Sequence, residues 1–238
     1  MASTRHSRGH SATPPPTFML PHAAHLRHEL TIKRSRFIAT AARVDSLTAA
    51  RDFFAHVHAE FPDARHHCTA VRVEGEIAAQ PITRSSDDGE PAGTAGRPML
   101  GVLTASGLIN AAVVVTRYFG GTLLGTGGLV RAYSDSVRQV LHGAPIVRRE
   151  PAQLLSVTVP YALAGKLEAD LRTYGFEHIN ARYTAHDVQL QAQVRTVDGE
   201  TFYQLVAQLT EGAAQPQLIN NTHMEIRAGK IALIGSDS

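Results

Sequence analysis

The 238-residue chain contains a single cysteine, Cys68, and this shortage excludes an internal disulfide framework and fits a reducing compartment. The chain also lacks any apolar run approaching the ~20 residues that a helix needs to span a bilayer. Its first residues, MASTRHSRGHSATPPP, have no apolar stretch of the kind that marks a secretory signal. These absences predict a cytoplasmic protein that has no contact with a membrane.

The chain has little net charge, and its value of +2 at pH 7 hides an asymmetry. Residues 1–150 carry 17 basic and 12 acidic side chains, whereas residues 151–238 carry 6 basic and 9 acidic ones. Residues 1–37 alone hold 6 basic groups and 1 acidic group, which accounts for the whole excess of the first part. The charge therefore permits nucleic-acid binding without demanding it, and it assigns any polyanion contact to the first part.

Composition and periodicity predict two folded domains of the α+β class. Residues 1–24 are rich in Ser, Thr, Pro and His, which predicts a disordered N-terminal tail. Residues 25–147 are predicted to form the first domain, residues 148–151 (RREP) a linker, and residues 231–238 a second tail. Residues 152–230 show the order β-α-β-β-α-β, which is the ferredoxin-like split βαβ plan.

Several elements of the first domain are indicated by local patterns. Ser46 is a suitable N-cap for a helix that ends before Pro62. Residues 66–73 alternate like a half-buried strand, and the continuous apolar run at 111–116 predicts a buried one. A helix is expected over about 127–141.

Two glycine-rich blocks carry most of the chemistry in the sequence. The first reads SSDDGEPAGTAGRPM (85–99), and the second, VVVTRYFGGTLLGTGGLVRAYSDS (113–136), runs from a strand through glycines into a helix. Glycine at this density indicates sharp turns or close approach of a partner to the main chain. The free N–H groups of the second block predict an anion site, with Arg117 or Arg131 as another contact. A tight turn in which glycine only relieves backbone strain is the equal alternative.

The second block matches neither common nucleotide-binding loop. Gly120 and Gly125 have the spacing of a P-loop, but Thr126 and Gly127 stand where Lys and Ser or Thr are required. The dinucleotide fingerprint fails at its third glycine, where Val130 stands. Only a generic anion site therefore survives as a prediction.

Asp87, Asp88 and Glu90 form an acidic cluster that could hold a hard cation such as Mg²⁺ through oxygen ligands. The spacing of an EF-hand is absent, and the further ligands of a catalytic two-metal site are not visible. Adjacent aspartates in a glycine-rich loop more often form Asx-turns and cap the next helix, so this structural role is favoured. We expect no metal and no cofactor.

His66, His67 and Cys68 suggest a metal site or a nucleophile at first sight. On a strand His66 and Cys68 share one face and His67 lies on the other, and no pattern such as C-x-x-C completes a zinc site. A thiol on a half-buried strand is more often an inert core group. No catalytic residue is predicted.

Together these motifs resemble the IMPACT family in its bacterial, two-domain YigZ type. The resemblance covers nearly the whole chain after the first two dozen residues. The matching segments are KRSRFI at 33–38, His66 with Cys68, SDDGEPAGTAG at 86–96, TRYFGG at 116–121 and LGTGGLVRAYSD at 124–135. Leu123 departs from the family pattern, because relatives often carry lysine there, and Thr69 and Val71 replace frequent aromatic residues.

The resemblance implies a first domain similar to domain IV of elongation factor G and a ferredoxin-like second domain similar to its domain V. In eukaryotic relatives the matching domain is linked to control of translation initiation, by competition for the activator of a kinase that phosphorylates an initiation factor. The bacterial branch has no settled biochemical activity.

We therefore predict a non-catalytic protein that binds RNA or a component of the translation machinery and regulates translation. Arginines of the two blocks would meet phosphate, while the glycines allow close approach. Two alternatives stay open, namely a Mg²⁺-dependent enzyme acting on a phosphate ester and a pure protein-interaction module. The candidate binding residues are Asp87, Asp88, Glu90, Gly93, Thr94, Arg97, Arg117, Gly120, Gly121, Gly127, Gly128 and Arg131.

Overall fold

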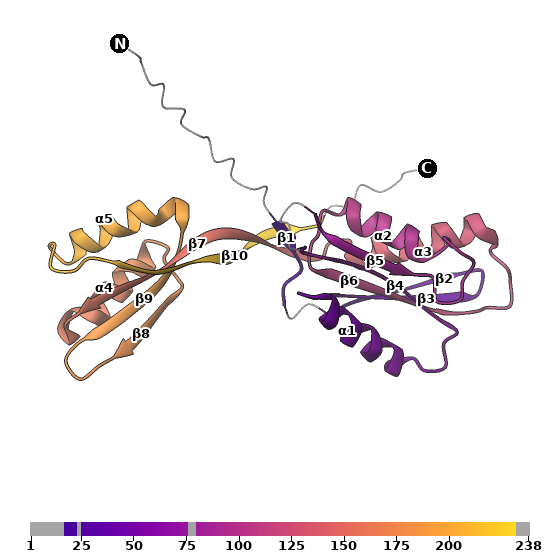
Figure 1. Ribbon diagram of the computed structural model, residues 1–238, viewed down its shortest axis with the longest axis horizontal. Helices are drawn as coiled ribbons and strands as arrows, with labels where there is room; N and C mark the ends of the chain where they lie inside the picture. Colours follow the sequence, from indigo (N-terminus) through magenta and orange to yellow (C-terminus); the bar gives the residue numbers. More distant parts are fainter. Residues whose placement is uncertain (1–16, 23–24, 76–79, 232–238) are drawn as a thin grey trace, which may run out of the picture.

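The computed structural model describes residues 17–22, 25–75 and 80–231. This part of the chain forms two five-stranded sheets with their helices, arranged as two bodies joined by a long ribbon of strands β7 (Pro145–Val159) and β10 (Gln217–Lys230) (Figure 1). The two-domain α+β architecture predicted from the sequence is thus confirmed.

The sheet of the first domain is antiparallel throughout, with the strand order β2-β3-β6-β4-β5. Its strands are β2 (His25–Ile32), β3 (Ser35–Arg43), β4 (His66–Val73), β5 (Ile82–Ser86) and β6 (Ala111–Tyr118). Three helices cover this sheet, α1 (Leu47–Glu60) on one face, and α2 (Gly96–Ala105) and α3 (Gly125–Leu141) on the other.

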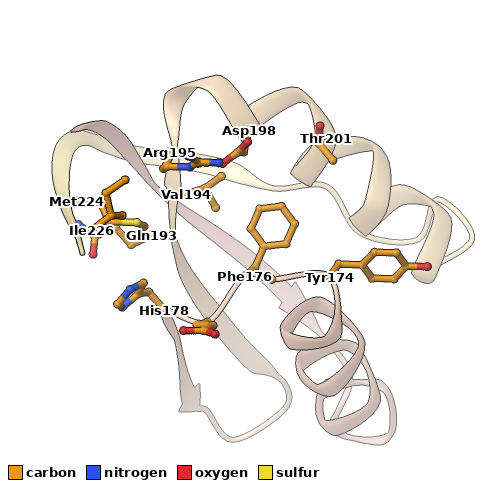
Figure 2. Close-up of a pocket in the computed structure, with 12 residues that line it drawn as sticks. Tyr174, Phe176, His178, Gln193, Val194, Arg195, Asp198, Thr201, Met224 and Ile226 are labelled. Atoms are coloured by element: carbon orange, nitrogen blue, oxygen red, sulfur yellow. Dashed lines mark hydrogen bonds and ion pairs between the residues drawn. The ribbon is translucent and has the colours of Figure 1, made fainter. Parts of the chain in front are cut away.

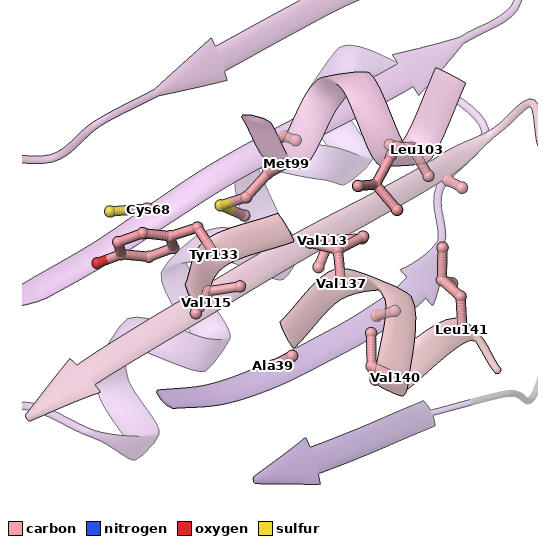
Figure 3. Packing of buried hydrophobic residues seen from close by; sticks show 14 of the residues in the cluster. Ala39, Cys68, Met99, Leu103, Val113, Val115, Tyr133, Val137, Val140 and Leu141 are labelled. Carbon is pink, nitrogen blue, oxygen red and sulfur yellow. The ribbon is translucent and has the colours of Figure 1, made fainter. Parts of the chain in front are cut away.

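Alternation along β6 explains how one strand serves both faces of the sheet. Val113 and Val115 belong to the core beneath α2 and α3, whereas Ala112 packs with the apolar side of α1. Figure 3 shows the larger core, in which side chains of α2 and α3 point at the strands. The labelled members from the helices are Met99, Leu103, Tyr133, Val137, Val140 and Leu141.

The predicted helix boundaries are close to those observed. The Ser46 hydroxyl accepts a hydrogen bond from the Ala49 N–H at 3.0 Å, as an N-cap does, and α1 ends before Pro62. Helix α3 begins at Gly125, two residues earlier than about 127, and Gly125 itself has the left-handed φ of +75° that glycine adopts without strain.

The second domain has the predicted order β-α-β-β-α-β. After β7 it contains α4 (Tyr161–Thr173), β8 (Ile179–Tyr183), β9 (Val188–Arg195), a short 3-10 turn (Thr196–Asp198), α5 (Gly199–Leu209) and β10. Strand β7 pairs with both β10 and β9, and β8 forms an edge beside β9. The inward residues of these strands form a core with α4 and α5 that is separate from that of the first domain.

The segment 148–151 that the sequence predicts as a linker lies inside β7, the strand that runs between the two bodies. Arg148 is in register with Ile226 of β10 and with Phe18 of strand β1 (Thr17–Met19), so both edges of the strand are paired there. The charged RREP sequence suggested an exposed connection. In the folded chain Arg149 instead donates to a Glu74 carboxylate oxygen at 2.6 Å.

Parts of the two predicted tails are also ordered. Met19 and Leu20 are fully buried, and Ile231 packs on the first-domain core with its N–H donating to the Ala144 carbonyl at 2.9 Å. The average composition of residues 1–24 is polar, and it hides the short apolar segment around Met19. That segment is buried because β1 pairs with β7, which satisfies its backbone hydrogen bonds. The rest of the predicted tails lies outside the described residues.

Candidate functional site

Asp87 holds the start of α2. Its Oδ1 accepts the N–H groups of Ala95 at 2.9 Å and Gly96 at 2.8 Å, and its Oδ2 accepts that of Gly93 at 2.8 Å. Partial burial opposes ionisation, but these three bonds outweigh it and hold the pKa of Asp87 below its usual value. The carboxylate therefore acts as a helix cap, which is the structural role favoured from the sequence.

Asp88 ties the same loop to β4. Its Oδ2 accepts the backbone N–H of His67 at 2.6 Å, and its carbonyl oxygen lies 2.8 Å from Nδ1 of His66. Thr94 closes the loop by donating its hydroxyl to the Pro91 carbonyl at 2.7 Å. Within the described ranges, no group of three or more His, Cys, Asp and Glu side chains is placed to hold a metal ion.

Glu90 and Arg117 form a buried ion pair. Their side chains are 3% and 6% exposed, and Oε1 of Glu90 accepts Nη1 of Arg117 at 2.5 Å and the Tyr133 hydroxyl at 2.8 Å. The Arg117 guanidinium also lies over the rings of Phe37, at 5.2 Å, and Phe119, at 5.7 Å. The charge of Arg117 is therefore compensated by Glu90, and its side chain is held in place. Arg117 is not the exposed cation that the predicted anion site called for.

Cys68 lies in the same core beside Tyr133 (Figure 3). Its thiol donates to the Asp87 carbonyl oxygen at 3.0 Å, and burial raises its pKa to about 12. Such a thiol carries almost no thiolate at neutral pH, so it has neither the exposure nor the charge of a nucleophile. The structure agrees with the interpretation of Cys68 as an inert core group.

The turn between β2 and β3 presents two basic residues in an unusual backbone conformation. Lys33 has φ +46° and Arg34 has φ +67°, so both central positions of this two-residue hairpin are left-handed. Glycine and asparagine normally occupy such positions, because a side chain there is strained. From the sequence, this segment contributes only to the family resemblance and is not placed in the site.

The second glycine-rich block packs directly against that turn. A Cβ atom on Gly120 would lie 2.0 Å from the backbone carbon of Arg34, so only glycine fits. The Gly120 N–H donates to the Ser35 hydroxyl at 3.1 Å, and Arg34 donates to the Thr122 hydroxyl at 3.1 Å. Two segments far apart in the sequence are thus locked into one surface.

A cavity of ≈ 440 Å³ opens beside this surface. One wall is the first turn of α3, which has no side-chain cap and no acidic residue among its first positions. The lining combines basic, aromatic and aliphatic groups, namely Arg65, His66, Glu90, Pro91, Arg117, Phe119, Leu123, Leu124, Gly125, Thr126 and Leu129. This arrangement can receive an anion at the helix start and an apolar group against Phe119 and the leucines.

The predicted arginines are not gathered at one point. Arg97 is exposed on the first turn of α2 and Arg131 is exposed on α3, and neither lines the cavity. Gly121 lies in the loop with φ +82°, while Gly127 and Gly128 belong to the first turn of α3.

Sequence reasoning missed Ser35, Arg65, Phe119 and Tyr133 as parts of the site. Phe119 and Tyr133 belong to the second glycine-rich block and Ser35 to the KRSRFI segment, but their part in the site depends on contacts between segments that are distant in the sequence.

The second domain has its own hollow, of ≈ 420 Å³ (Figure 2). Phe176 and Val194 contribute apolar surface, and Asp198 accepts a hydrogen bond from Nε of Arg195 at 2.5 Å. None of the predicted site residues lines this hollow, and the charge of its arginine is already compensated.

A search of the described helices finds none that is both long and apolar enough to cross a membrane.

Comparison with known proteins gives consistent matches over both domains. The family model described as "Impact N-terminal domain" matches residues 33–141, and one described as "Domain of unknown function (DUF1949)" matches residues 157–213. "IMPACT family member YigZ" of Escherichia coli (strain K12) is 41% identical over 184 residues, which cover 77% of this chain and 89% of that protein. "IMPACT family member YvyE" of Bacillus subtilis (strain 168) is 36% identical over 198 residues, with 83% and 89% covered.

A solved structure described as "Crystal structure of an hypothetical protein" aligns over 86% of this chain and 98% of its own, with a TM-score of 0.55 and 38% identity. The matches therefore extend across the junction between the two domains.

Proposed function

The chain belongs to the IMPACT family, and from this premise we propose that it is a non-catalytic binding protein that contacts RNA, free or within the translation machinery. We place the contact on the first domain, around the β2–β3 turn and the start of α3. A role in regulating translation and the likeness to domains IV and V of elongation factor G belong to the same proposal, because the family resemblance implies them. A cytoplasmic location also belongs to it, on the ground of the single cysteine.

The observation that carries this proposal is the strained basic turn. Lys33 and Arg34 stand at left-handed positions, and the backbone of Arg34 is packed against Gly120. Left-handed backbone angles at residues other than glycine raise the energy of the folded state, so they persist only where the surrounding structure enforces them. Such strained residues are concentrated at functional sites. Here it holds two cations beside an uncapped helix start, which suits a phosphate backbone.

The enzyme alternative finds little support in the same residues. The carboxylates of Asp87 and Asp88 accept backbone N–H groups, and Glu90 is bound to Arg117 and Tyr133. A Mg²⁺ ion would have to displace these donors, at the cost of the α2 cap. The binding proposal requires no such rearrangement.

A protein partner is a second candidate, and exposed apolar side chains favour it. Phe119 is 45% exposed, Leu123 83% and Val130 39%, and all three lie on the second block or its helix. Contacts of this kind depend weakly on salt, whereas neutralising phosphates releases counterions.

The test replaces Lys33-Arg34 by Asn-Gly, the pair that this turn type prefers. We expect the hairpin to gain roughly 1 kcal/mol by relief of strain, while affinity for a structured RNA falls. Because two phosphate contacts are removed, the negative slope of log affinity against log salt should become shallower by about 1.4–1.8. Arg182→Ala, which removes an exposed arginine of β8 in the second domain, is the control and should change neither quantity.

Titrations of the wild type and the two variants with a structured RNA at several salt concentrations measure both the affinity and its dependence on salt. Undetectable binding at low salt, or a turn variant that binds like the wild type, would overturn the proposed surface. A salt-independent interaction that is lost on Leu123→Ser would support the protein partner instead.

A further inference from the structure

The cavity beside α3 has features that a general phosphate-binding surface does not need. We propose that it binds the terminal phosphate of a nucleotide, with the phosphate at the first turn of α3 and the base against Phe119 and Leu123. This inference rests on the proposed RNA contact and names the part of the RNA that the cavity takes.

The phosphate end of the cavity is defined by backbone donors. Gly125 and Thr126 line it as the first residues of α3, and that helix is 17 residues long. The N–H groups of a first turn have no partner within the helix, and their dipole favours negative charge. In α2 the same groups are occupied by Asp87, whereas no side chain of residues 17–22, 25–75 and 80–231 caps α3.

Arg117 supplies the independent observation that points to a ligand. Its side chain is more than nine-tenths buried and lines the cavity, yet its Nε has no hydrogen-bond partner in the described part of the chain. The other bonds go to Glu90 at 2.5 Å and to Ser35 at 3.4 Å, so the guanidinium keeps unused donors. Buried donors without acceptors are rare in native proteins, and an anion in the cavity would supply acceptors.

The charges at the cavity favour an anion in spite of Glu90. That carboxylate is held by Arg117 and Tyr133, and Arg65 on the rim adds a second, exposed cation. The three ionised groups sum to one positive charge, and His66 adds to it when protonated. A terminal phosphate carries up to two negative charges and three free oxygens, whereas an internal phosphodiester carries one charge and must let the chain continue on both sides.

The apolar part of the lining suits a base. Phe119 is 45% exposed and lies over the Arg117 guanidinium, and Leu123, at 83% exposure, continues the apolar surface. Aromatic side chains stack on bases without sequence preference. The volume of ≈ 440 Å³ lies within the range of sites for single small ligands, which suits one nucleotide and not a duplex.

The test uses the full chain and three probes, which are a short single-stranded RNA with a 5′-phosphate, the same RNA with a 5′-hydroxyl, and adenosine monophosphate. The phosphorylated RNA should bind at least tenfold more tightly than the hydroxyl form. Thr126→Glu should abolish this preference, because it places a carboxylate at the phosphate position. It should still fold, since acidic residues stabilise a first turn.

Gln139→Glu is the control, and it should keep the preference because it adds a carboxylate at an exposed position of α3 outside the lining of the cavity. Phe119→Ala should weaken the nucleotide and the phosphorylated RNA by about tenfold, as expected for the loss of one stacked base. Inorganic phosphate serves as competitor, and it should compete far less well than adenosine monophosphate.

The outcomes separate this inference from the proposed function. If both RNAs bind equally and Thr126→Glu changes nothing, the cavity assignment is wrong although the RNA contact stands. If adenosine monophosphate binds and is lost in Thr126→Glu while neither RNA binds, the cavity is supported and the RNA contact is overturned. Equal competition by inorganic phosphate would overturn the role of the apolar wall.

Discussion

Glu90 lies where the first glycine-rich block, strand β6 and helix α3 meet, and its single Oε1 atom accepts from both Arg117 and Tyr133. Burying two charges is costly, and the pair is stabilising only while both members are present and further hydrogen bonds complete the group. The ion pair therefore links the integrity of the cavity to the packing of the core.

Glu90→Gln should lower the free energy of unfolding by about 3–5 kcal/mol, because it leaves the buried charge of Arg117 uncompensated. Urea unfolding followed by circular dichroism measures this change. Glu168→Gln is the control, since it breaks an exposed pair with Arg172 on α4 and should cost less than about 0.5 kcal/mol. Equal effects of the two substitutions would show that the buried pair has no special role.

Asp87→Ala should lower stability by about 2 kcal/mol at pH 7, since a charged cap accepting three N–H groups is lost. The pKa of Asp87 is lowered on folding, so its contribution is present above the usual value of 3.8 and is lost as the pH falls through the folded value. The difference between wild type and variant should therefore shrink in acid. Ser46→Ala, which removes the uncharged cap of α1, should show no such pH dependence, because a serine hydroxyl does not titrate in this range.

At the scale of elements, the site depends on how the loop after β6 meets the β2–β3 hairpin. Gly120 makes this contact possible, because any side chain there would meet the backbone of Arg34 and Ser35. The glycines of one block thus have different roles, and substitution by alanine separates them.

Gly120→Ala should destabilise the protein by roughly 1–3 kcal/mol, because it forces the turn and the loop apart. Gly127→Ala should instead stabilise it by up to about 1 kcal/mol, since that glycine is helical and a Cβ there meets nothing within 4 Å. Thermal unfolding of both variants measures the contrast. Two equal shifts of the same sign would contradict the assignment of a close contact to Gly120 alone.

At the scale of the whole molecule, the domains are joined by paired strands and not by a flexible connection. Strand β7 is paired with β10 from Pro145 to Ser156 and with β9 from Ala152 onward. Arg43 of β3 also donates to Glu225 of β10 at 2.8 Å. Fragments 25–147 and 152–238 would cut through this ribbon, so we expect each fragment to be less stable than the same residues in the intact chain.

The strand β1 gives a direct test of this arrangement. A chain of residues 21–238 should be less stable than one of residues 17–238 by about 3–6 kcal/mol, because Met19 and Leu20 are fully buried and each contributes about 1.5–3 kcal/mol. Urea unfolding of the two chains measures the difference. Equal stability would mean that the contacts of β1 add nothing to the junction.

The sequence by itself determined the features that depend on neighbouring residues. The Ser46 cap, the strands at 66–73 and 111–116, the order β-α-β-β-α-β and the capping role of Asp87 are all indicated by patterns within short stretches of the chain. The family resemblance rested on motifs of the same local kind, and the relatives confirm it.

Only the tertiary structure decided which of these segments meet. Gly120 and Ser35 are in contact although they are 85 positions apart in the sequence, and Glu90 and Arg117 are 27 positions apart. Residues of β7 form a strand that joins the two bodies because they pair with β10 and β1. Charge patterns in the sequence could not show this. An arginine on a solvated surface is free to bind an anion, whereas an arginine beside a buried carboxylate is already neutralised by it. The physical reason is that pairing over long separations is selected by the packing of the whole chain and leaves little trace in any local window.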